Sequence, residues 1–371
     1  MKNVDVSIIV PLYYGRKYID NIINQVTKCY KKLRNYSIEL ILYNDSPDEE
    51  INLNGVVSDY KIKVIQTTCN KGIHVARTEG LKHSKGSYIL FLDQDDVIYE
   101  DYLYSQIDKI GEKDAIVCRL LNNNKQHYNN TFVFEEVISK EFMTNCWCSI
   151  VSPGQVLIKR DAIPEIWLNN CLNNNGADDY FLWILMFMQD REFALNQDIL
   201  FEHINTGSNT SYNTNKMMDS EQEMLELLMS NNILSNLQVK RLSESLRRIH
   251  VADLDKKKRL CDFFIRWNQN IINKKIPYKR LIDNNINRIA IYGASELGQS
   301  IDMLLEDTPI RMNYYIDQNA KYLTLSKPVF ELNKKLEKVD AVILTIADNN
   351  VRKNIYEIMN CKVYLAEELL G

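Results

Sequence analysis

The sequence lacks any run of the roughly 20 consecutive apolar residues that a membrane-spanning helix requires, so no transmembrane segment is expected. Its first residues lead directly into a predicted strand, and we therefore expect no signal peptide. An excess of positive charge is also missing, because the formal net charge is -4. Nucleic acid is for this reason not an expected partner, and we expect a cytoplasmic protein.

The sequence also lacks cysteines in metal-binding spacing. Eight cysteines are scattered through 371 residues, and the one close pair, Cys146 and Cys148, does not have zinc-finger spacing. We interpret them as reduced thiols, which suits a cytoplasmic protein. Internal repeats and low-complexity linkers are absent from the sequence as well. The length predicts two or three domains with ample core.

The sequence does contain an alternation of strand and helix patterns over its first 92 residues. Short apolar runs predict strands, and apolar residues at helical spacing predict helices between them. This alternation is typical of a parallel, Rossmann-like sheet. The predicted strands are residues 6–10, 39–43, 63–66 and 88–92, and the predicted helices are residues 16–34 and 72–81.

The fourth predicted strand ends in a group of carboxylates. Its apolar run is followed directly by Asp93, Gln94, Asp95 and Asp96. Open α/β sheets place their ligands at the carboxyl ends of their strands. Carboxylate oxygens suit Mg2+ or Mn2+, and these ions usually share their coordination sphere with phosphate oxygens. The segment is therefore either a nucleoside diphosphate site or a solvated acidic turn after a strand.

Three more polar clusters follow or adjoin the other predicted strands. Because the carboxyl ends of parallel strands converge on one edge of a sheet, all of these clusters could bind one nucleoside diphosphate. The clusters are Pro11-Leu12-Tyr13, Asn44-Asp45-Ser46-Pro47-Asp48, and Asn70-Lys71-Gly72 with Arg77 further along the same predicted helix.

Each side chain would have its own task in such a site. Tyr13 is a candidate to stack on the base, and Asp45 is a candidate to accept a hydrogen bond from a ring N-H. Lys71 and Arg77 are candidates to approach the phosphates. A metal ion is expected on Asp95, with Asp93 directed towards the ribose or the metal.

These four features together resemble the motifs of family 2 glycosyltransferases, which have the GT-A fold. One such motif alone would be unspecific, whereas four in the same order are specific. The resemblance covers residues 4–215. The similar segments are Val6 to Tyr13; Asn44 to Asp48, one residue shorter than the family's Asp-Asp-Gly-Ser-x-Asp turn; Asn70 to Gly80, similar to Asn-x-Gly-x-x-x-Ala-Arg-Asn-x-Gly; and Gly86 to Asp96, similar to the strand that carries Asp-x-Asp.

The resemblance also implies a catalytic carboxylate. The family carries a Glu-Asp pair on a helix beneath the acceptor, and Asp178-Asp179 resembles this pair with Asp178 in place of Glu. Asp179 would then remove a proton from the acceptor hydroxyl during an inverting, single-displacement transfer. The shorter Asp178 leaves open which of the two carboxylates is the base. Without the resemblance, both residues would be interpreted as the acidic start of a helix.

Four further residues are candidates for the donor and acceptor pocket. His203 matches a histidine that in some relatives ligates the metal or contacts the diphosphate, although a lone histidine is more often structural. Gln155 lies where relatives line the sugar pocket. Trp147 and Trp183 are candidates to stack on a sugar, although buried aromatic residues usually belong to the core.

The last 85 residues or so predict a second, smaller α/β unit. A predicted strand at 288–292 is followed by Gly293-x-Ser295-x-x-Gly298, and a later strand ends in Asp317. Ser295 replaces the middle glycine of a dinucleotide fingerprint, where a side chain crowds a pyrophosphate. The unit resembles small Rossmann-like modules appended to sugar-processing enzymes. A structural, oligomerising or partner-binding role and a nucleotide-binding role both stay open.

The region between the two α/β parts is predicted to be helical throughout. Basic residues in the segment 240–280 would allow peripheral contact with anionic lipid near a lipid-linked acceptor. The alternative is the solvated face of an interdomain helical bundle.

The sequence thus predicts an α/β protein in three parts: a GT-A, Rossmann-like nucleotide-sugar-binding domain (1–215), a helical linker region (216–286) and a small Rossmann-like domain (287–371). The expected function is glycosyl transfer, dependent on Mn2+ or Mg2+, from a UDP-sugar to a free or lipid-linked bacterial surface glycan, with a homo-oligomer as one expected state. The alternatives are a non-catalytic nucleotide-binding scaffold and an NAD-dependent enzyme centred on residues 288–371. The candidate residues are Pro11, Leu12, Tyr13, Asp45, Lys71, Gly72, Arg77, Asp93, Gln94 and Gln155 for the donor, Asp95, Asp93 and His203 for the metal, and Asp179 and Asp178 for catalysis.

Overall fold

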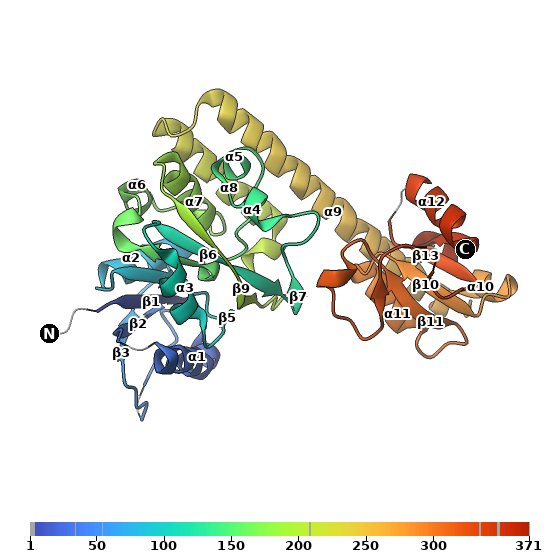
Figure 1. Cartoon of the computed structure of the whole chain (residues 1–371), viewed down its shortest axis with the longest axis horizontal. Coiled ribbons are helices and arrows are strands. Elements are labelled where there is room, and N and C mark those ends of the chain that lie inside the picture. Colours follow the sequence, from blue (N-terminus) through green and yellow to red (C-terminus); the bar gives the residue numbers. More distant parts are fainter. Residues whose placement is uncertain are drawn as a thin grey trace. The chain divides into compact units, whose positions relative to one another are not determined.

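The computed structural model describes residues 4–33, 35–53, 55–207, 209–333, 335–346 and 349–370. The first three residues, where we expected no signal peptide, lie outside the described part. The chain divides into two compact units, Met1–His250 and Val251–Gly371, and each has its own sheet (Figure 1). Over the described residues, no helix combines the length and apolar character needed to cross a membrane.

One mixed sheet forms the centre of the first unit. Its strand order is β3-β2-β1-β4-β8-β6-β9-β5, and β7 pairs with β6. The first four of these strands are parallel, as the sequence predicted. β8 then runs antiparallel to both β4 and β6. The strands are β1 (Val6–Leu12), β2 (Ile38–Asn44), β3 (Lys61–Gln66), β4 (Tyr88–Phe91), β5 (Val97–Ile98), β6 (Ala115–Asn122), β7 (Lys125–Gln126), β8 (Val156–Lys159) and β9 (Phe193–His203).

Helices pack on this sheet and on one another. α2 contacts β1 and β2, α3 contacts β6 and β9, and α7 contacts α5, α6 and α8. The helices are α1 (Ile19–Lys32), α2 (Ile73–Lys82), α3 (Tyr102–Ile110), α4 (Phe134–Val137), α5 (Lys140–Asn145), α6 (Glu165–Asn169), α7 (Asp178–Met188), α8 (Thr214–Ser230) and α9 (Asn236–Ile272).

The central strands are buried on both faces, and one glycine sets how closely a helix covers them. Every residue of β1 and β2 is buried, which explains why these strands are nearly continuous apolar runs in the sequence. α2 approaches β1 at Gly80, where a Cβ atom would lie 2.4 Å from Cγ2 of Ile9. The motif glycine therefore allows α2 to pack directly onto the sheet.

The register of the parallel strands brings three strand ends together. β4 pairs with β1, and the N-H of Leu92 donates to the carbonyl of Ile9 at 2.9 Å. After β2, the N-H of Asp45 donates to the carbonyl of Leu12 at 2.8 Å. The residues that follow β1, β2 and β4 consequently meet at one edge of the sheet, where parallel α/β sheets bind ligands.

The helical stretch 216–286 does not form a body of its own. Leu228 of α8 and Leu242 of α9 belong to the core of the first unit. Phe263 and Trp267, later in α9, belong to the core of the second unit, together with Leu281 of α10 (Lys279–Asp283). The stretch is helical as predicted, but the division between the two units falls inside α9.

The second unit contains a five-stranded parallel sheet of order β12-β11-β10-β13-β14. Alternate residues of its strands belong to two separate apolar clusters: Ile289 and Ile291 lie in one, and Ala290 lies in the other. Two covered faces are typical of a Rossmann-like unit, so this prediction is confirmed. The elements are β10 (Arg288–Tyr292), α11 (Glu296–Leu305), β11 (Arg311–Ile316), β12 (Val329–Phe330), β13 (Ala341–Leu344), α12 (Asn349–Met359) and β14 (Lys362–Leu365).

Candidate functional site

The edge of the sheet at the ends of β1, β2 and β4 opens on a cavity of about 640 Å³ in the first unit. A cavity of this size is in the range of small-molecule sites. Candidate residues from distant parts of the sequence line it together. These are Pro11, Leu12, Tyr13, Asp45, Gly72, Arg77, Asp93, Gln94, Asp95, Asp178, Asp179 and His203.

The carboxylate of Asp45 holds the loop that precedes α2. It accepts hydrogen bonds from the backbone N-H groups of Lys71 (2.9 Å) and Gly72 (2.8 Å). Gly72 has a φ of 87°, which strains other residues, and a Cβ there would lie 2.9 Å from Oδ1 of Asn175. Burial raises the pKa of Asp45. The side chain of Lys71 is exposed, and this residue is not among the described residues that line the cavity.

Gln94 fixes the backbone of Tyr13 at the end of β1. Its Oε1 accepts a hydrogen bond from the N-H of Tyr13 at 3.0 Å, and its Nε2 donates to the carbonyl of the same residue at 3.2 Å. Tyr13 is 51% exposed and meets the ring of Tyr14 edge-on, with 4.7 Å between ring centroids. The backbone of Tyr13 is thus fixed by Gln94, while its ring stays accessible at the cavity.

Arg77 forms a buried bridge between two carboxylates. Its Nη1 lies 2.6 Å from Oδ2 of Asp178, and its Nη2 lies 2.5 Å from Oδ1 of Asp93. Burial alone would lower the pKa of Arg77, but the charges of Asp178, Asp93 and Asp179 outweigh it and raise this pKa. The Nε of Arg77 is buried and has no hydrogen-bond acceptor among the described residues. The guanidinium therefore links α2 to the loop after β4 and to α7, and its Nε makes no hydrogen bond to the described residues.

Asp179 differs from its neighbour Asp178 in its surroundings. Asp178 is engaged by Arg77, whereas Asp179 accepts a hydrogen bond from the N-H of Tyr180 at 2.7 Å, within the first turn of α7. Burial and the charge of Asp178 raise the pKa of Asp179 to about 7. A carboxylate with a raised pKa is a stronger base, so Asp179 is suited to accept a proton near neutral pH.

Asp96 positions His203 and is not among the described residues that line the cavity. Its carboxylate is fully buried and accepts hydrogen bonds from Ser152 Oγ (2.7 Å), His203 Nδ1 (2.8 Å) and the N-H of Ile204 (3.1 Å). Burial lowers the pKa of His203, but the hydrogen bond and charge of Asp96 outweigh it and raise this pKa. Because Nδ1 of His203 contacts Asp96, Nε2 is the ring nitrogen that this contact does not use.

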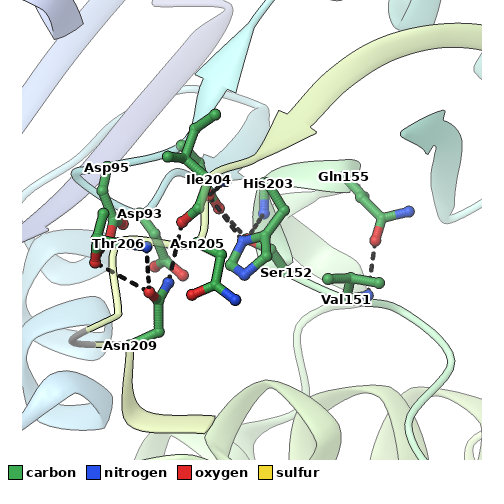
Figure 2. A network of polar contacts seen from close by, with 12 residues as sticks. Asp93, Asp95, Val151, Ser152, Gln155, His203, Ile204, Asn205, Thr206 and Asn209 are labelled. Atoms are coloured by element: carbon green, nitrogen blue, oxygen red, sulfur yellow. Dashed lines mark hydrogen bonds and ion pairs between the residues drawn. The ribbon is translucent and has the colours of Figure 1, made fainter. Parts of the chain in front are cut away.

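Asp95 lies against the loop that follows β9. Thr206 Oγ1 lies 3.5 Å from Oδ2 of Asp95 and 3.0 Å from Oδ1 of Asn209, and its one proton can be donated to either acceptor (Figure 2). Burial, followed by the charges of Asp93 and Asp96, raises the pKa of Asp95 to about 6. In the described residues, no group of three or more His, Cys, Asp or Glu side chains is placed to hold a metal ion. Any metal would therefore need further ligands from a bound molecule.

Gln155 lies away from the cavity, and we correct the expectation that it contacts a sugar. Its side chain is fully buried. Its Nε2 donates to the carbonyl of Cys118 (3.1 Å) and to the hydroxyl of Tyr128 (2.9 Å), and its Oε1 accepts from the N-H of Val151 (2.7 Å; Figure 2). The side-chain amide of Gln155 is therefore used in hydrogen bonds within the core, and these bonds stabilise the segment before β8.

The two candidate tryptophans lie in different environments. Trp183 is fully buried in the core on α7, so the alternative that it is a core residue holds. Trp147 is partly buried, lines the cavity and packs edge-on against Phe142 at 4.6 Å between ring centroids. Of the pair, Trp147 is the one placed to meet a ligand.

The sequence analysis missed a buried pair at the helical side of the cavity. Nε2 of His250 lies 2.7 Å from Oε2 of Glu221, and both residues line the cavity together with Leu246. They lie on α8 and α9, which we had assigned to a linker, and no motif marks them. His127 also lines the cavity, and burial lowers its pKa to about 4. Only the inclusion of α8 and α9 in the core of the first unit reveals the place of Glu221 and His250.

The candidate dinucleotide motif of the second unit is engaged in local contacts. Oδ2 of Asp317 accepts a hydrogen bond from the N-H of Ala294 at 3.0 Å. Ser295 Oγ donates to Thr345 Oγ1 at 3.3 Å. A Cβ at Gly298 would lie 2.2 Å from the carbonyl oxygen of Gly293, so this glycine serves the close packing of α11 on β10.

The fold and the carboxylate-lined cavity define the first unit as an α/β protein with a candidate ligand site at the carboxyl ends of its parallel strands. Within this class, residues 7–167 match the model of Glycosyl transferase family 2, and residues 288–359 match that of the PglD N-terminal domain. Residues 7–167 of the first unit are therefore similar to family 2 glycosyltransferases. The resemblance inferred from the four motifs is confirmed.

Individual known proteins are similar as well. Glycosyltransferase GlyA of Streptococcus pneumoniae is 24% identical over 96% of this chain, which spans about half (51%) of the length of GlyA. The UDP-Glc:alpha-D-GlcNAc-diphosphoundecaprenol beta-1,3-glucosyltransferase WfgD of Escherichia coli is 24% identical over 59% of this chain and 83% of its own. The crystal structure of S. aureus TarS 1-349 in complex with UDP-GlcNAc is similar with a TM-score of 0.49 and 17% identity, covering 66% of this chain and 72% of that one.

Proposed function

We propose that the first unit transfers a sugar from a nucleotide sugar to an acceptor hydroxyl, with inversion at the anomeric carbon. The observation that carries this proposal is the contrast between two adjacent carboxylates at the cavity. Asp178 is held by Arg77, whereas Asp179 has a raised pKa and accepts a backbone hydrogen bond. An inverting transfer needs one such base and no protein nucleophile.

The proton and the sugar move in one step. Asp179 takes the proton of the acceptor hydroxyl as the oxygen of this hydroxyl attacks the anomeric carbon. The bond from this carbon to the diphosphate breaks, and the nucleoside diphosphate leaves with the bonding electron pair. Positive character develops at the anomeric carbon, as in glycoside hydrolysis. The charge of Asp178, which lies next to the base, is balanced by Arg77.

Other residues of the cavity hold the donor. Tyr13 stacks on the base with its accessible ring, and Asp45 keeps the loop around Gly72 open towards the ligand. Arg77 lines the same cavity, but its two Nη atoms are held by Asp178 and Asp93, so this arginine shapes the cavity wall.

The residues present fit a divalent cation, Mn2+ or Mg2+. The carboxylate of Asp95 and the second ring nitrogen of His203 line the cavity. The pKa of Asp95 is raised by burial and by two neighbouring carboxylates, and a cation would relieve this repulsion. Oxygens of the diphosphate would complete its coordination. When bound, such an ion would act as a Lewis acid that stabilises the leaving diphosphate.

The donor and acceptor classes rest on the relatives. WfgD is named for a UDP-glucose donor and a diphosphoundecaprenol-linked acceptor. We propose a UDP-sugar as donor and a hydroxyl of a surface glycan, free or lipid-linked, as acceptor. Because nucleotide sugars are made in the cytoplasm, we propose that the protein acts there or at the inner face of the membrane.

The acceptor would occupy the helical side of the cavity. Trp147 offers an aromatic face, and Glu221 with His250 offers polar atoms within an apolar wall that includes Leu246. An aromatic ring beside a carboxylate suits the apolar face and the hydroxyls of a sugar. Both groups lie in the same cavity as the base Asp179.

The release of UDP from a panel of UDP-sugars with Mn2+ tests the proposal. We expect the wild-type protein to hydrolyse one donor slowly, because water can replace the acceptor, and we expect Asp95→Ala to lose this activity. Asp101→Asn, which changes an exposed carboxylate at the start of α3, is the matched control and should keep it. Equal release by wild type and Asp95→Ala would contradict the assignment of the metal and donor site.

A non-catalytic scaffold is the alternative of a different class. It would bind a nucleotide through the same cavity but would not need a general base, so the raised pKa of Asp179 would have no role. Binding of UDP without turnover of any donor, with or without added sugar acceptors, would favour it. Loss of hydrolysis in Asp179→Asn with unchanged UDP binding would instead support catalysis.

A further inference from the structure

The part of α9 that belongs to the second unit has two different apolar faces. One face packs into the unit, where Phe263 and Trp267 are buried and Leu260 contacts the same core. On this side Arg259 also donates to Glu367 at 2.5 Å. This face is fully explained by the fold of the second unit, whereas the opposite face of the helix is exposed.

The exposed face forms a stripe with a three-four repeat. Leu254 is 46% exposed, Ile265 is 54% exposed and Ile272 is 77% exposed. Single exposed apolar residues are common on protein surfaces, but a stripe that repeats every seven residues is typical of a helix that pairs with another helix. The outer stripe of α9 consists of Val251, Leu254, Lys258, Cys261, Ile265, Asn268 and Ile272.

We propose that two copies of this chain associate through the outer stripe of α9 as a parallel, in-register coiled coil. In heptad notation the a positions are 251, 258, 265 and 272, and the d positions are 254, 261 and 268. Val251, Ile265 and Ile272 are β-branched residues at a, and Leu254 lies at d. This choice of residues favours two parallel strands.

The charges beside the stripe favour the parallel orientation. Asp255 and Asp262 lie at e positions, and Lys257 lies at a g position. In a parallel pair, g of one helix meets e of the next heptad of the other, so Lys257 meets Asp262 of the second copy. In an antiparallel pair, e faces e, which would bring the acidic Asp255 and Asp262 of the two copies together. Lys257 pairs within its own helix with Asp253 at 2.7 Å and can exchange this contact for the second copy.

Two polar positions within the stripe fix the register. Lys258 at a and Asn268 at d cost stability, but a polar residue in a coiled-coil seam specifies alignment and oligomeric state. Cys261 is exposed at a d position. A parallel, in-register pair places the Cys261 thiols of the two copies face to face, whereas a shifted or antiparallel pair does not.

An anionic membrane is the other occupant that the apolar stripe suggests. Its negative surface attracts Lys and Arg beside an apolar face. The stripe contains Lys258 and lies beside Lys257, but Asp255 and Asp262 flank it as well, and such a surface would repel these two carboxylates. The complementary charges of Lys257 and Asp262 suit a second helix of the same sequence better.

Light scattering of the full chain at micromolar concentration tests the association. We expect a mass twice the 43.4 kDa of one chain, and loss of this dimer in the double variant Leu254→Lys, Ile265→Lys. Met303→Lys is the control. It changes an apolar residue on α11 that is 74% exposed but lies outside the stripe, and this variant should stay dimeric. A monomeric wild type, or a dimer that survives the double variant, would overturn the proposal.

Two further measurements test the orientation. Oxidation by copper phenanthroline and air should join two chains through one disulfide, and Cys261→Ser should remove the covalent dimer but keep the non-covalent one. Lys257→Asp should weaken the dimer by about tenfold, because attractive pairs become repulsive, and adding Asp262→Lys should restore it. A dimer without the Cys261 cross-link would refute the parallel register. A monomer that sediments with phosphatidylglycerol vesicles would show that the stripe binds membrane instead.

Discussion

Arg77 and Asp178 form a buried ion pair at 2.6 Å between residues that are 101 positions apart in the sequence. Both side chains are at most 3% exposed. The second amino group of Arg77 reaches Asp93 at 2.5 Å, so one guanidinium joins α2, the loop after β4 and α7 at the wall of the cavity. The motif arginine is therefore a structural tie, and its partner Asp178 is less suited than Asp179 to act as a base.

Removal of this guanidinium should destabilise the first unit strongly. Arg77→Ala leaves the carboxylate of Asp178 buried without its partner, and loss of one member of a buried pair typically costs about 3–5 kcal/mol. We expect the free energy of unfolding, measured with urea, to fall by this amount. Lys82→Ala is the control on the same helix, because its ion pair with Glu79 is exposed and should contribute about 1 kcal/mol or less. Equal effects of the two variants would contradict the structural role of Arg77.

The pH dependence of turnover should report the pKa of Asp179. A general base must be ionised, and burial beside Asp178 raises this pKa to about 7. The rate of UDP release should therefore fall about tenfold for each pH unit below 7 and level off above it. Asp179→Asn should lower the rate by about 10²–10⁴-fold and remove this pH dependence. A wild-type rate that stays constant down to about pH 5 would point to a base with an ordinary carboxyl pKa.

Asp96 should act on the metal requirement through His203. Asp96→Asn weakens the hydrogen bond that orients the imidazole at 2.8 Å, and loss of such supporting contacts typically weakens metal binding about 10–100-fold. We expect the Mn2+ concentration for half-maximal UDP release to rise by this factor, while the rate at saturating Mn2+ changes little. A loss of rate at every Mn2+ concentration, with an unchanged midpoint, would mean that Asp96 does not act through the metal.

Gln155 should contribute to stability and not to donor binding. Gln155→Leu removes hydrogen bonds to Val151, Cys118 and Tyr128 in a fully buried position, and should lower the free energy of unfolding by about 3 kcal/mol. The KM for the UDP-sugar, measured below the unfolding transition, should not change. Gln197→Leu, at an exposed position of β9, should alter neither. A raised KM with unchanged stability would restore the sugar contact that the sequence suggested.

The sheet and the edge that carries the cavity could be predicted from the sequence because their signals are local. Apolar runs such as Val6–Val10 mark buried strands, and the polar residues that end them, such as Asp45 and Asp93, meet wherever the strands are parallel. The GT-A domain could be recognised because four such strand ends carry the family's motifs in order.

Side-chain partners could not be predicted, because they depend on contacts between distant segments. The sequence places Arg77 near a phosphate, but its direction is set by Asp178 on a helix that begins 101 residues later. The role of Asp96 depends on His203, 107 residues away. Glu221 and His250 reach the cavity only because α8 and α9 pack on the first unit. None of these relationships has a spacing that a single sequence reveals.

Calorimetric titration of UDP in the presence of Mn2+ tests the central claim, a nucleotide-sugar site at the end of β1, β2 and β4, most directly. The account predicts saturable, micromolar binding by the wild-type protein, with no heat from the Asp95→Ala variant at the same concentrations. Absence of UDP binding to the wild type, with a folded protein and excess Mn2+, would contradict it.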